Sequence, residues 1–245
     1  MRRVIAVIQA RAGSSRSPGK VLHDLGGRPV LAWVVAAARE SNVCSDVVVA
    51  TTVLDDDDAV AACASELGAV VVRGPVDDVL ARFLLALDTV GARPGDVVVR
   101  LTADCPLLDP RLIAQCVRSF SPERLDYVTT DHVETIAHGF DVEVVSVAAL
   151  RRVDALASGA DRSHVTSYIA SHPEEFRVAD FALGRSSVDL RVTLDEPADA
   201  RLLDEVVAEL GSRANEWRAV VGLLRERPDL VALNAHVGVK PLALG

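Results

Sequence analysis

Three cations and a glycine follow the first apolar run of the chain. The run covers residues 4–8, and the segment after it contains Arg11, Arg16 and Lys20, with Gly13 among them. In a strand, a glycine-bearing loop and a helix, backbone amides gather around a phosphate group. Three cations in so short a segment can neutralise a triphosphate. The segment therefore predicts a phosphate site, and the alternative is a surface loop whose cations face solvent.

The common glycine-loop signatures do not fit this segment. A Walker A loop has one residue fewer between its glycines, and its lysine is followed by Ser or Thr, whereas Val21 follows Lys20 here. The dinucleotide-binding fingerprint is also absent. The phosphate hypothesis needs support from the rest of the chain.

Two aspartates stand at predicted strand ends. Asp104 follows the predicted strand 97–102, at the carboxyl end where open α/β sheets place ligands. Asp195 follows the predicted strand 188–194. Each aspartate also has a structural interpretation, because Asp104 suits a turn and Asp195 suits a helix N-cap before Pro197. The acidic run 55–58 is interpreted as a helix N-terminus and not as a metal site.

The apolar pattern predicts the framework that positions these residues. Continuous valine and isoleucine runs are typical of strands covered on both faces, as in a parallel sheet built from βαβ units. The predicted strands of the first half are 4–8, 47–51, 69–72 and 97–102, and helices are predicted at 29–41 and 77–90. The 245 residues, half of them hydrophobic, can bury one full core, so we expect a single domain, 1–245.

The order and type of the predicted elements change after Asp131. A strand is predicted at 141–147, a helix at 160–171, a mixed strand at 176–183 and a further strand at 188–194, before a helix at 197–210. We interpret this as an α+β insertion at about 131–187 in an α/β fold of Rossmann-like type. The fold class expected is a mostly parallel sheet flanked by helices.

Charge and hydropathy exclude several classes of protein. The formal charge of −9 argues against a general nucleic-acid surface or an anionic membrane as partner. No apolar run reaches the length of a membrane span, and we expect a soluble cytoplasmic protein. The four cysteines form no metal-binding spacing and are interpreted as small buried hydrophobic residues, with Cys105 packed beside Asp104.

The glycine segment resembles a known nucleotide-binding signature. "QARAGSSRSPGKVLHDLGGRPVL" is similar to that of the cytidylyltransferases that make CMP-activated sugar acids, especially the spore-coat polysaccharide cytidylyltransferase-like family. Six further segments match in the same order, over about four fifths of the chain: "VVVATT", "RGPVDDVLARF", "VVRLTADCPLLDP", "HGFDVEVVS", "DRSHVTSYI" and "LRVTLDEPAD". Two departures stand out: Ser17, where relatives have leucine, and residues 137–139, which lack an expected proline near the glycine.

The resemblance implies an activity and a site. It implies a fold of the nucleotide-diphospho-sugar transferase type and a Mg²⁺-dependent transfer of CMP from CTP to a small anionic, sugar-acid-like acceptor. It assigns Arg11, Lys20, Asp104 and Asp195 to catalysis, with both aspartates as metal ligands. Nucleotide binding falls to Gln9, Ala10, Arg11, Ala12, Gly13, Ser14, Arg16, Lys20, Thr51, Arg73, Asp78 and Arg82. An Asp78–Arg82 ion pair within one helix is an equally good alternative to nucleotide contacts by these two residues.

The resemblance places the acceptor over the predicted insertion. The candidates are His138, Asp141, Glu143, Arg162, His164 and Arg191, each of which could equally form a surface salt bridge. By analogy with the family we expect a homodimer.

Three other functions remain possible from the sequence. One is a sugar-1-phosphate nucleotidyltransferase that uses another triphosphate. Another is a nucleotide-sugar-dependent glycosyltransferase, although the aspartate run 55–58 precedes a helix and does not follow a strand. The third is a noncatalytic nucleotide-binding subunit, which has less use for two metal-binding carboxylates.

Overall fold

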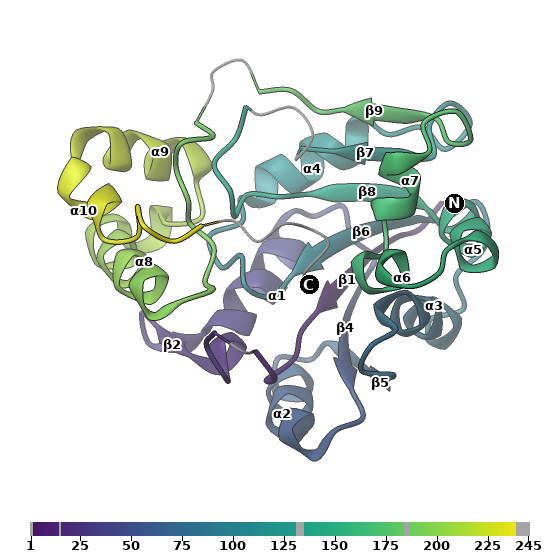
Figure 1. The fold of residues 1–245 in the computed structure, drawn as a ribbon, viewed down its shortest axis with the longest axis horizontal. Coiled ribbons are helices and arrows are strands. Elements are labelled where there is room, and N and C mark those ends of the chain that lie inside the picture. The colour runs from purple at the N-terminus through teal and green to yellow at the C-terminus, as the bar shows by residue number, and fades with distance from the viewer. Residues whose placement is uncertain (1, 15, 131–134, 184–186, 239–245) are drawn as a thin grey trace.

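The structure is a computed structural model, and it describes residues 2–14, 16–130, 135–183 and 187–238. Its centre is a seven-stranded sheet in the order β5-β4-β1-β6-β8-β7-β9 (Figure 1). The strands are β1 Val4–Gln9, β4 Asp46–Thr52, β5 Val70–Gly74, β6 Val97–Thr102, β7 Tyr127–Thr129, β8 Glu143–Ser146 and β9 Val178–Asp180. Strands β5, β4, β1 and β6 are mutually parallel, whereas β8 is antiparallel to both of its neighbours. The predicted class, a mostly parallel α/β sheet, is confirmed.

Helices cover both faces of the sheet. They are α1 Val30–Glu40, α2 Asp58–Glu66, α3 Val79–Thr89, α4 Pro110–Ser119, α5 Val147–Leu156, α6 Ala160–His164, α7 Ser167–Ser171, α8 Pro197–Leu210, α9 Trp217–Glu226 and α10 Pro228–Ala232. Short 3₁₀ turns occur at η1 Lys20–Leu22, η2 Asp55–Asp57 and η3 Gly211–Arg213, and β2 Asp24–Leu25 pairs with β3 Arg28–Pro29. None of the helices in these described segments is both long and apolar enough to cross a bilayer.

Strand β1 shows why the sheet is buried on both sides. Ala6 and Ile8 belong to the core that includes Leu31 of α1, while Ile5 and Val7 belong to the core on the opposite face, with Phe83 of α3. Side chains alternate across a strand, so a run that is apolar at every position needs a layer of helices on each face. The result fixes the carboxyl ends of β1 and β6 side by side, since these two strands pair along their whole length.

Two predicted elements of the second half are wrong in detail. Residues 188–194 form no strand of the sheet; the segment begins with a turn and has one isolated bridge, between His138 and Arg191. The predicted helix 160–171 is split into α6 and α7 at Val165, which has a φ of 62° and a ψ of −56°. A β-branched residue in this conformation cannot continue an α-helix.

The predicted insertion contributes two strands to the main sheet. Its strand β8 pairs with β6, and its strand β9 pairs with β7. Residues 131–134 and 184–186, which mark the two ends of that insertion, lie outside the described residues. The division at these points stays a prediction.

Candidate active site

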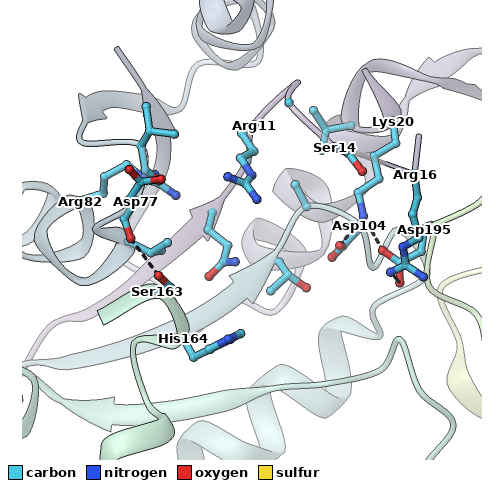
Figure 2. A pocket seen from close by; sticks show the side chains of 18 residues that line it. Arg11, Ser14, Arg16, Lys20, Asp77, Arg82, Asp104, Ser163, His164 and Asp195 are labelled. Atoms are coloured by element: carbon cyan, nitrogen blue, oxygen red, sulfur yellow. Dashed lines mark hydrogen bonds and ion pairs between the residues drawn. The ribbon is translucent and has the colours of Figure 1, made fainter. Parts of the chain in front are cut away.

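A cavity of about 430 Å³ opens at the carboxyl ends of β1 and β6. It is lined by the segment after β1, by the loop after β6, by the start of α3, by α6 and by Asp195. Figure 2 shows Lys20, Asp104, Asp195 and Arg16 at one end and Arg82, Asp77, Ser163 and His164 at the other, with Arg11 between them. These segments are far apart in the sequence, and the sheet brings their ends together.

The glycine loop is held by a buried aspartate. The Oδ1 atom of Asp57 accepts a hydrogen bond from the amide of Ala12 at 2.6 Å, and its Oδ2 atom accepts one from the hydroxyl of Thr52. Asp57 is only 1% exposed. Its side chain does not cap α2, so the capping interpretation of the acidic run does not describe this residue. Sequence reasoning missed its role, because Asp57 looks like its three neighbours in the run.

Lys20 lies between the two predicted metal ligands. Its Nζ atom donates to Oδ2 of Asp104 and to Oδ1 of Asp195, both at 2.7 Å, as the dashed lines of Figure 2 show. Its side chain is 11% exposed, so most of the ammonium's hydration has been replaced by the two carboxylates. Two aspartates that are 91 positions apart thus share one cation.

The loop before Asp195 is fastened directly to Asp104. The amide of Leu194 donates to the carbonyl oxygen of Asp104 at 2.8 Å, and the hydroxyl of Thr193 donates to the same oxygen at 3.1 Å. Helix α8 begins after Glu196, which forms a capping box with Asp199. Glu196 therefore takes the N-cap position that the sequence offered to Asp195, and Asp195 remains available to the cavity.

Arginines balance the remaining oxygen of Asp195. Its Oδ2 atom lies 2.6 Å from Arg191 and 3.1 Å from Arg16. Arg191 also pairs with the fully buried Asp199 at 3.1 Å, and Asn234 donates to the same Asp199 oxygen at 2.8 Å. The segment after α10 thereby supports this end of the cavity through a chain of hydrogen bonds.

The charges at this end shift the pKa values in a consistent sense. Burial alone would raise the pKa of Asp195, but Lys20, Arg191 and Arg16 lower it to about 2. Burial alone would lower the pKa of Lys20, but Asp104 and Asp195 outweigh burial and raise it. Asp195 is ionised and Lys20 is charged at neutral pH.

These carboxylates fit a divalent metal ion. Oxygens of Asp104 and Asp195 already converge on one cationic nitrogen, so they can converge on a small metal ion in its place. Magnesium is bound in such sites by one or two carboxylates together with water and substrate phosphates. The donor set therefore suits an ion that arrives with a phosphate ligand.

The opposite end of the cavity carries arginines without carboxylate partners. Arg82 is 2% exposed and donates to the carbonyls of Pro75 and Val76 at 2.7 and 2.9 Å. Burial lowers the pKa of Arg82, and repulsion from Arg11 lowers it further, against the opposite effect of Asp57 and Asp78. Within the described residues, neither Arg11 nor Arg82 has a carboxylate at ion-pair distance. An anion placed between them would relieve their repulsion.

The wall formed by α6 presents a histidine. The amide of Thr166 donates to the carbonyl of His164 at 2.6 Å across Val165, which closes a γ-turn of positive φ. Ser163 fixes the same helix to the carbonyl of Asp77 at 2.9 Å. His164 lines the cavity, and its buried Nε2 atom has no hydrogen-bond partner among the described residues.

Most of the expected nucleotide residues line the cavity, and most of the expected acceptor residues do not. The lining includes Gln9, Ala10, Arg11, Gly13, Ser14, Arg16, Lys20, Arg82, Asp104, His164 and Asp195. Strand ends pointed to the glycine segment and to Asp104, whereas Arg82 in α3 and His164 in α6 were candidates only through the family resemblance. Asp77, Ser163 and Thr102 also line the cavity and were not among the candidates.

The other nucleotide candidates do not line the cavity. The amide of Ala12, within the loop, donates to Asp57, and Thr51 is fully buried in β4, where its hydroxyl has no hydrogen-bond partner among the described residues. Arg73 donates to the carbonyls of Thr52 and Leu54. Asp78 caps α3 by accepting from Ala81 and pairs with Arg162 at 2.6 Å, so the alternative Asp78–Arg82 ion pair is not formed.

The other acceptor candidates are bound to one another or to the framework. His138 lies 3.4 Å from Asp141. Glu143 is buried in a network with Arg100, Tyr127 and Thr166. Arg162 pairs with Asp78 and Asp154, and Arg191 lies behind Asp195. Their roles toward an acceptor stay predictions.

Sequence comparison identifies the family. The family model described as cytidylyltransferase matches residues 5–212, and the chain belongs to this family. A relative in Bacillus subtilis, the spore coat polysaccharide biosynthesis protein SpsF, is 30% identical, with 94% of this chain and 97% of that protein covered. The predicted resemblance is confirmed.

Solved structures agree with the fold. A cytidylyltransferase from Leptospira borgpetersenii superposes with a TM-score of 0.90 at 27% identity, covering 98% of this chain and 100% of that chain. CMP:2-keto-3-deoxy-manno-octonic acid synthetase in complex with CTP superposes with a TM-score of 0.67 at 16% identity, covering 84% and 99%. A manganese complex of a Mycobacterium tuberculosis protein shares the fold, with a TM-score of 0.60 at 16% identity over 83% and 98%.

Proposed function

We propose that this chain transfers CMP from CTP to a small anionic acceptor of the acid-sugar class, with Mg²⁺ as cofactor and release of pyrophosphate. Membership of the cytidylyltransferase family supports CTP as donor. The observation that carries the proposal is the convergence of Lys20, Asp104 and Asp195 beside the glycine loop. An acceptor of this class is the substrate of the synthetase that shares the fold.

The reaction forms one phosphorus–oxygen bond and breaks another. An acceptor hydroxyl releases its proton to solvent water as its oxygen attacks the α-phosphorus, and the bond from that phosphorus to the oxygen of the β-phosphate breaks. Negative charge gathers on the leaving pyrophosphate and on the nonbridging oxygens, so positioned cations lower the barrier. Magnesium, held by Asp104 and Asp195, would supply a Lewis acid that clamps the phosphates.

The chain's own residues would bind the triphosphate, the leaving group and the acceptor. Arg11 and the amides around Gly13 and Ser14 would bind the triphosphate, which is the anion that Arg11 and Arg82 lack. Lys20 would bind the phosphates of the leaving group. His164, which lines the cavity, would contact the acceptor. His164 is the one acceptor candidate that lines the cavity.

The test is pyrophosphate release with four nucleoside triphosphates and a panel of sugar acids, sugar phosphates and phosphonates. The proposal expects release with CTP and a sugar acid, lost on addition of a chelator and restored by Mg²⁺. Transfer from a nucleotide sugar, or tight triphosphate binding with no release under any condition, would contradict it.

The proposal also includes a homodimer and a cytoplasmic location. The four cysteines are all free, which suits a reducing compartment. Sedimentation of the purified chain tests the dimer, and fractionation of cells that express it tests the location.

A further inference from the structure

The ammonium of Lys20 occupies the place where the two carboxylates of the site meet. Its Nζ atom is 2.7 Å from Asp104 Oδ2 and 2.7 Å from Asp195 Oδ1. The side chain begins at η1, directly after Gly19, which has a φ of 72° and whose amide donates to the carbonyl of Ala12. The root of Lys20 is thus fixed to the glycine loop, while its long stem reaches into the acidic end of the cavity.

Lys20 and a divalent ion cannot share this place. Both need the same carboxylate oxygens, and two cations at contact distance repel each other strongly in a partly buried site. The ion cannot use the second oxygen of Asp195 instead, because Arg191 and Arg16 already contact it. The site as folded is therefore already neutralised, and it has little electrostatic affinity left for a bare ion.

A triphosphate would give Lys20 another partner. Arg11, Gly13 and Ser14 line the same cavity as Lys20, so phosphates held there would lie within the region that its flexible four-carbon stem can sweep. Phosphate oxygens accept charge-assisted hydrogen bonds from an ammonium group as carboxylates do. Once the ammonium moves to the phosphates, the two aspartates are free to bind the ion that the triphosphate carries.

We propose that Lys20 fills the ion's position between Asp104 and Asp195 until a triphosphate draws its ammonium away, so that the bare ion binds weakly and the nucleotide and metal enter together. The inference rests on the metal role of the two aspartates in the proposed function. It makes Lys20 a residue that couples two binding events, in addition to its proposed contact with the leaving group. Coupling of this kind is reciprocal in the two affinities.

The test measures binding of Mn²⁺ alone, without nucleotide, from the electron paramagnetic resonance signal of the free ion. The protein is first treated with a chelator and then dialysed. Lys20→Met removes the ammonium and keeps the length of the stem. We expect Lys20→Met to bind Mn²⁺ about tenfold more tightly than the unaltered chain, which corresponds to about 1.4 kcal/mol. Thermal melting checks that the variant is folded, and Lys20→Gln replaces it if it is not.

Two matched variants separate position from charge. Arg16→Met removes the same charge from a residue that contacts only one of the two aspartates, at 3.1 Å, and we expect a change in Mn²⁺ affinity well below that of Lys20→Met. The double variant Lys20→Met with Asp104→Asn removes a carboxylate as well as the competitor, and the gain should disappear. An equal effect of Arg16→Met and Lys20→Met, or a gain that survives in the double variant, would overturn the inference.

The result can be distinguished from failure of the proposed function. Mn²⁺ titration needs no turnover and no acceptor, whereas the proposed function is tested by pyrophosphate release. Unchanged or undetectable Mn²⁺ binding in Lys20→Met refutes the exchange even if the unaltered chain is an active cytidylyltransferase. Tighter binding in that variant supports the exchange even if the acceptor class proves wrong.

Discussion

The two ends of the cavity treat charge in opposite ways. At the acidic end, Lys20, Arg16 and Arg191 are paired with Asp104 and Asp195 at 2.6 to 3.1 Å. At the arginine end, Arg82 is more deeply buried but donates only to backbone carbonyls, and its pKa is lowered by burial and by Arg11. The charges at the acidic end balance one another. The guanidinium groups at the arginine end have no carboxylate at ion-pair distance among the described residues.

This difference indicates what each end gains from a ligand. An anion at the arginine end adds a negative charge where no described carboxylate lies at ion-pair distance, so it contributes binding energy directly. A cation at the acidic end has to displace the ammonium of Lys20, so it gains less binding energy. Such a cation would bind mainly when a nucleotide already occupies the cavity. Binding at the first end and chemistry at the second would then depend on different residues.

The largest expected effect comes from the acidic end. Under the proposed function, Asp104→Ala should reduce turnover of CTP about a thousandfold, because the metal would lose one of its two proposed protein ligands and the phosphates would lose their clamp. The fold should survive, since Asp104 lies at the cavity surface. Pyrophosphate release and thermal melting measure the two quantities. Asp189→Ala, at an exposed pair with Arg225, is the control, and full activity in Asp104→Ala would refute the assignment.

A smaller effect is expected at the arginine end. Arg82→Met should weaken CTP binding roughly ten- to a hundredfold, which is the usual value of hydrogen bonds to a charged group. Isothermal titration calorimetry with CTP measures the change. Arg118→Met, on the exposed side of α4, should leave CTP affinity unaltered. Equal affinities for the two variants would mean that Arg82 has only a structural role in this wall.

The loop between the two ends gives the next test. Asp57→Asn keeps the shape of the side chain but weakens its hold on the Ala12 amide and the Thr52 hydroxyl. CTP affinity should fall about tenfold, because a loosened loop loses the preorganised amides that bind phosphate. The neighbouring Asp56→Asn is the matched control, since Asp56 is exposed. A drop in melting temperature without a change in CTP affinity would contradict a positioning role for Asp57.

The smallest effect concerns an ordinary ion pair outside the cavity. Arg177 donates to Asp126 through its backbone amide, its Nε atom and a terminal nitrogen. The side-chain hydrogen bonds of Arg177 are the main cause that lowers the pKa of Asp126, and they outweigh the opposite effect of partial burial. A folded-state pKa below the unfolded value adds stability above the unfolded pKa, and that stability is lost as the pH falls.

The unaltered chain should therefore be more stable than Asp126→Asn above a pH of about 4, by about 1 kcal/mol or less, and the difference should shrink at lower pH. Urea unfolding between pH 3 and 6 measures this. A difference that grows on acidification would have the wrong sign for the lowered pKa. CTP affinity should be the same in both chains, which sets this pair apart from those of the cavity.

The local sequence pattern predicted an element correctly where its residues have one strong structural preference. The apolar runs predicted β1, β4, β5 and β6, and the proline and periodic leucines predicted α8 with its observed bounds. The pattern failed at 188–194, where Leu190, Val192 and Leu194 are buried but the backbone forms only one isolated bridge, with His138, and no strand of the sheet. It also missed the turn at Val165, because neither valine nor its neighbours signal a positive φ.

The sequence by itself determined the sheet that presents the carboxyl ends of β1 and β6, and the cations and aspartates available there. These follow from short-range periodicity and residue chemistry. Only the tertiary structure decided that Asp57 and not its neighbours holds the glycine loop, and that Lys20 lies between Asp104 and Asp195. Those outcomes depend on contacts between segments far apart in the chain, and no local pattern encodes which of several similar side chains will meet.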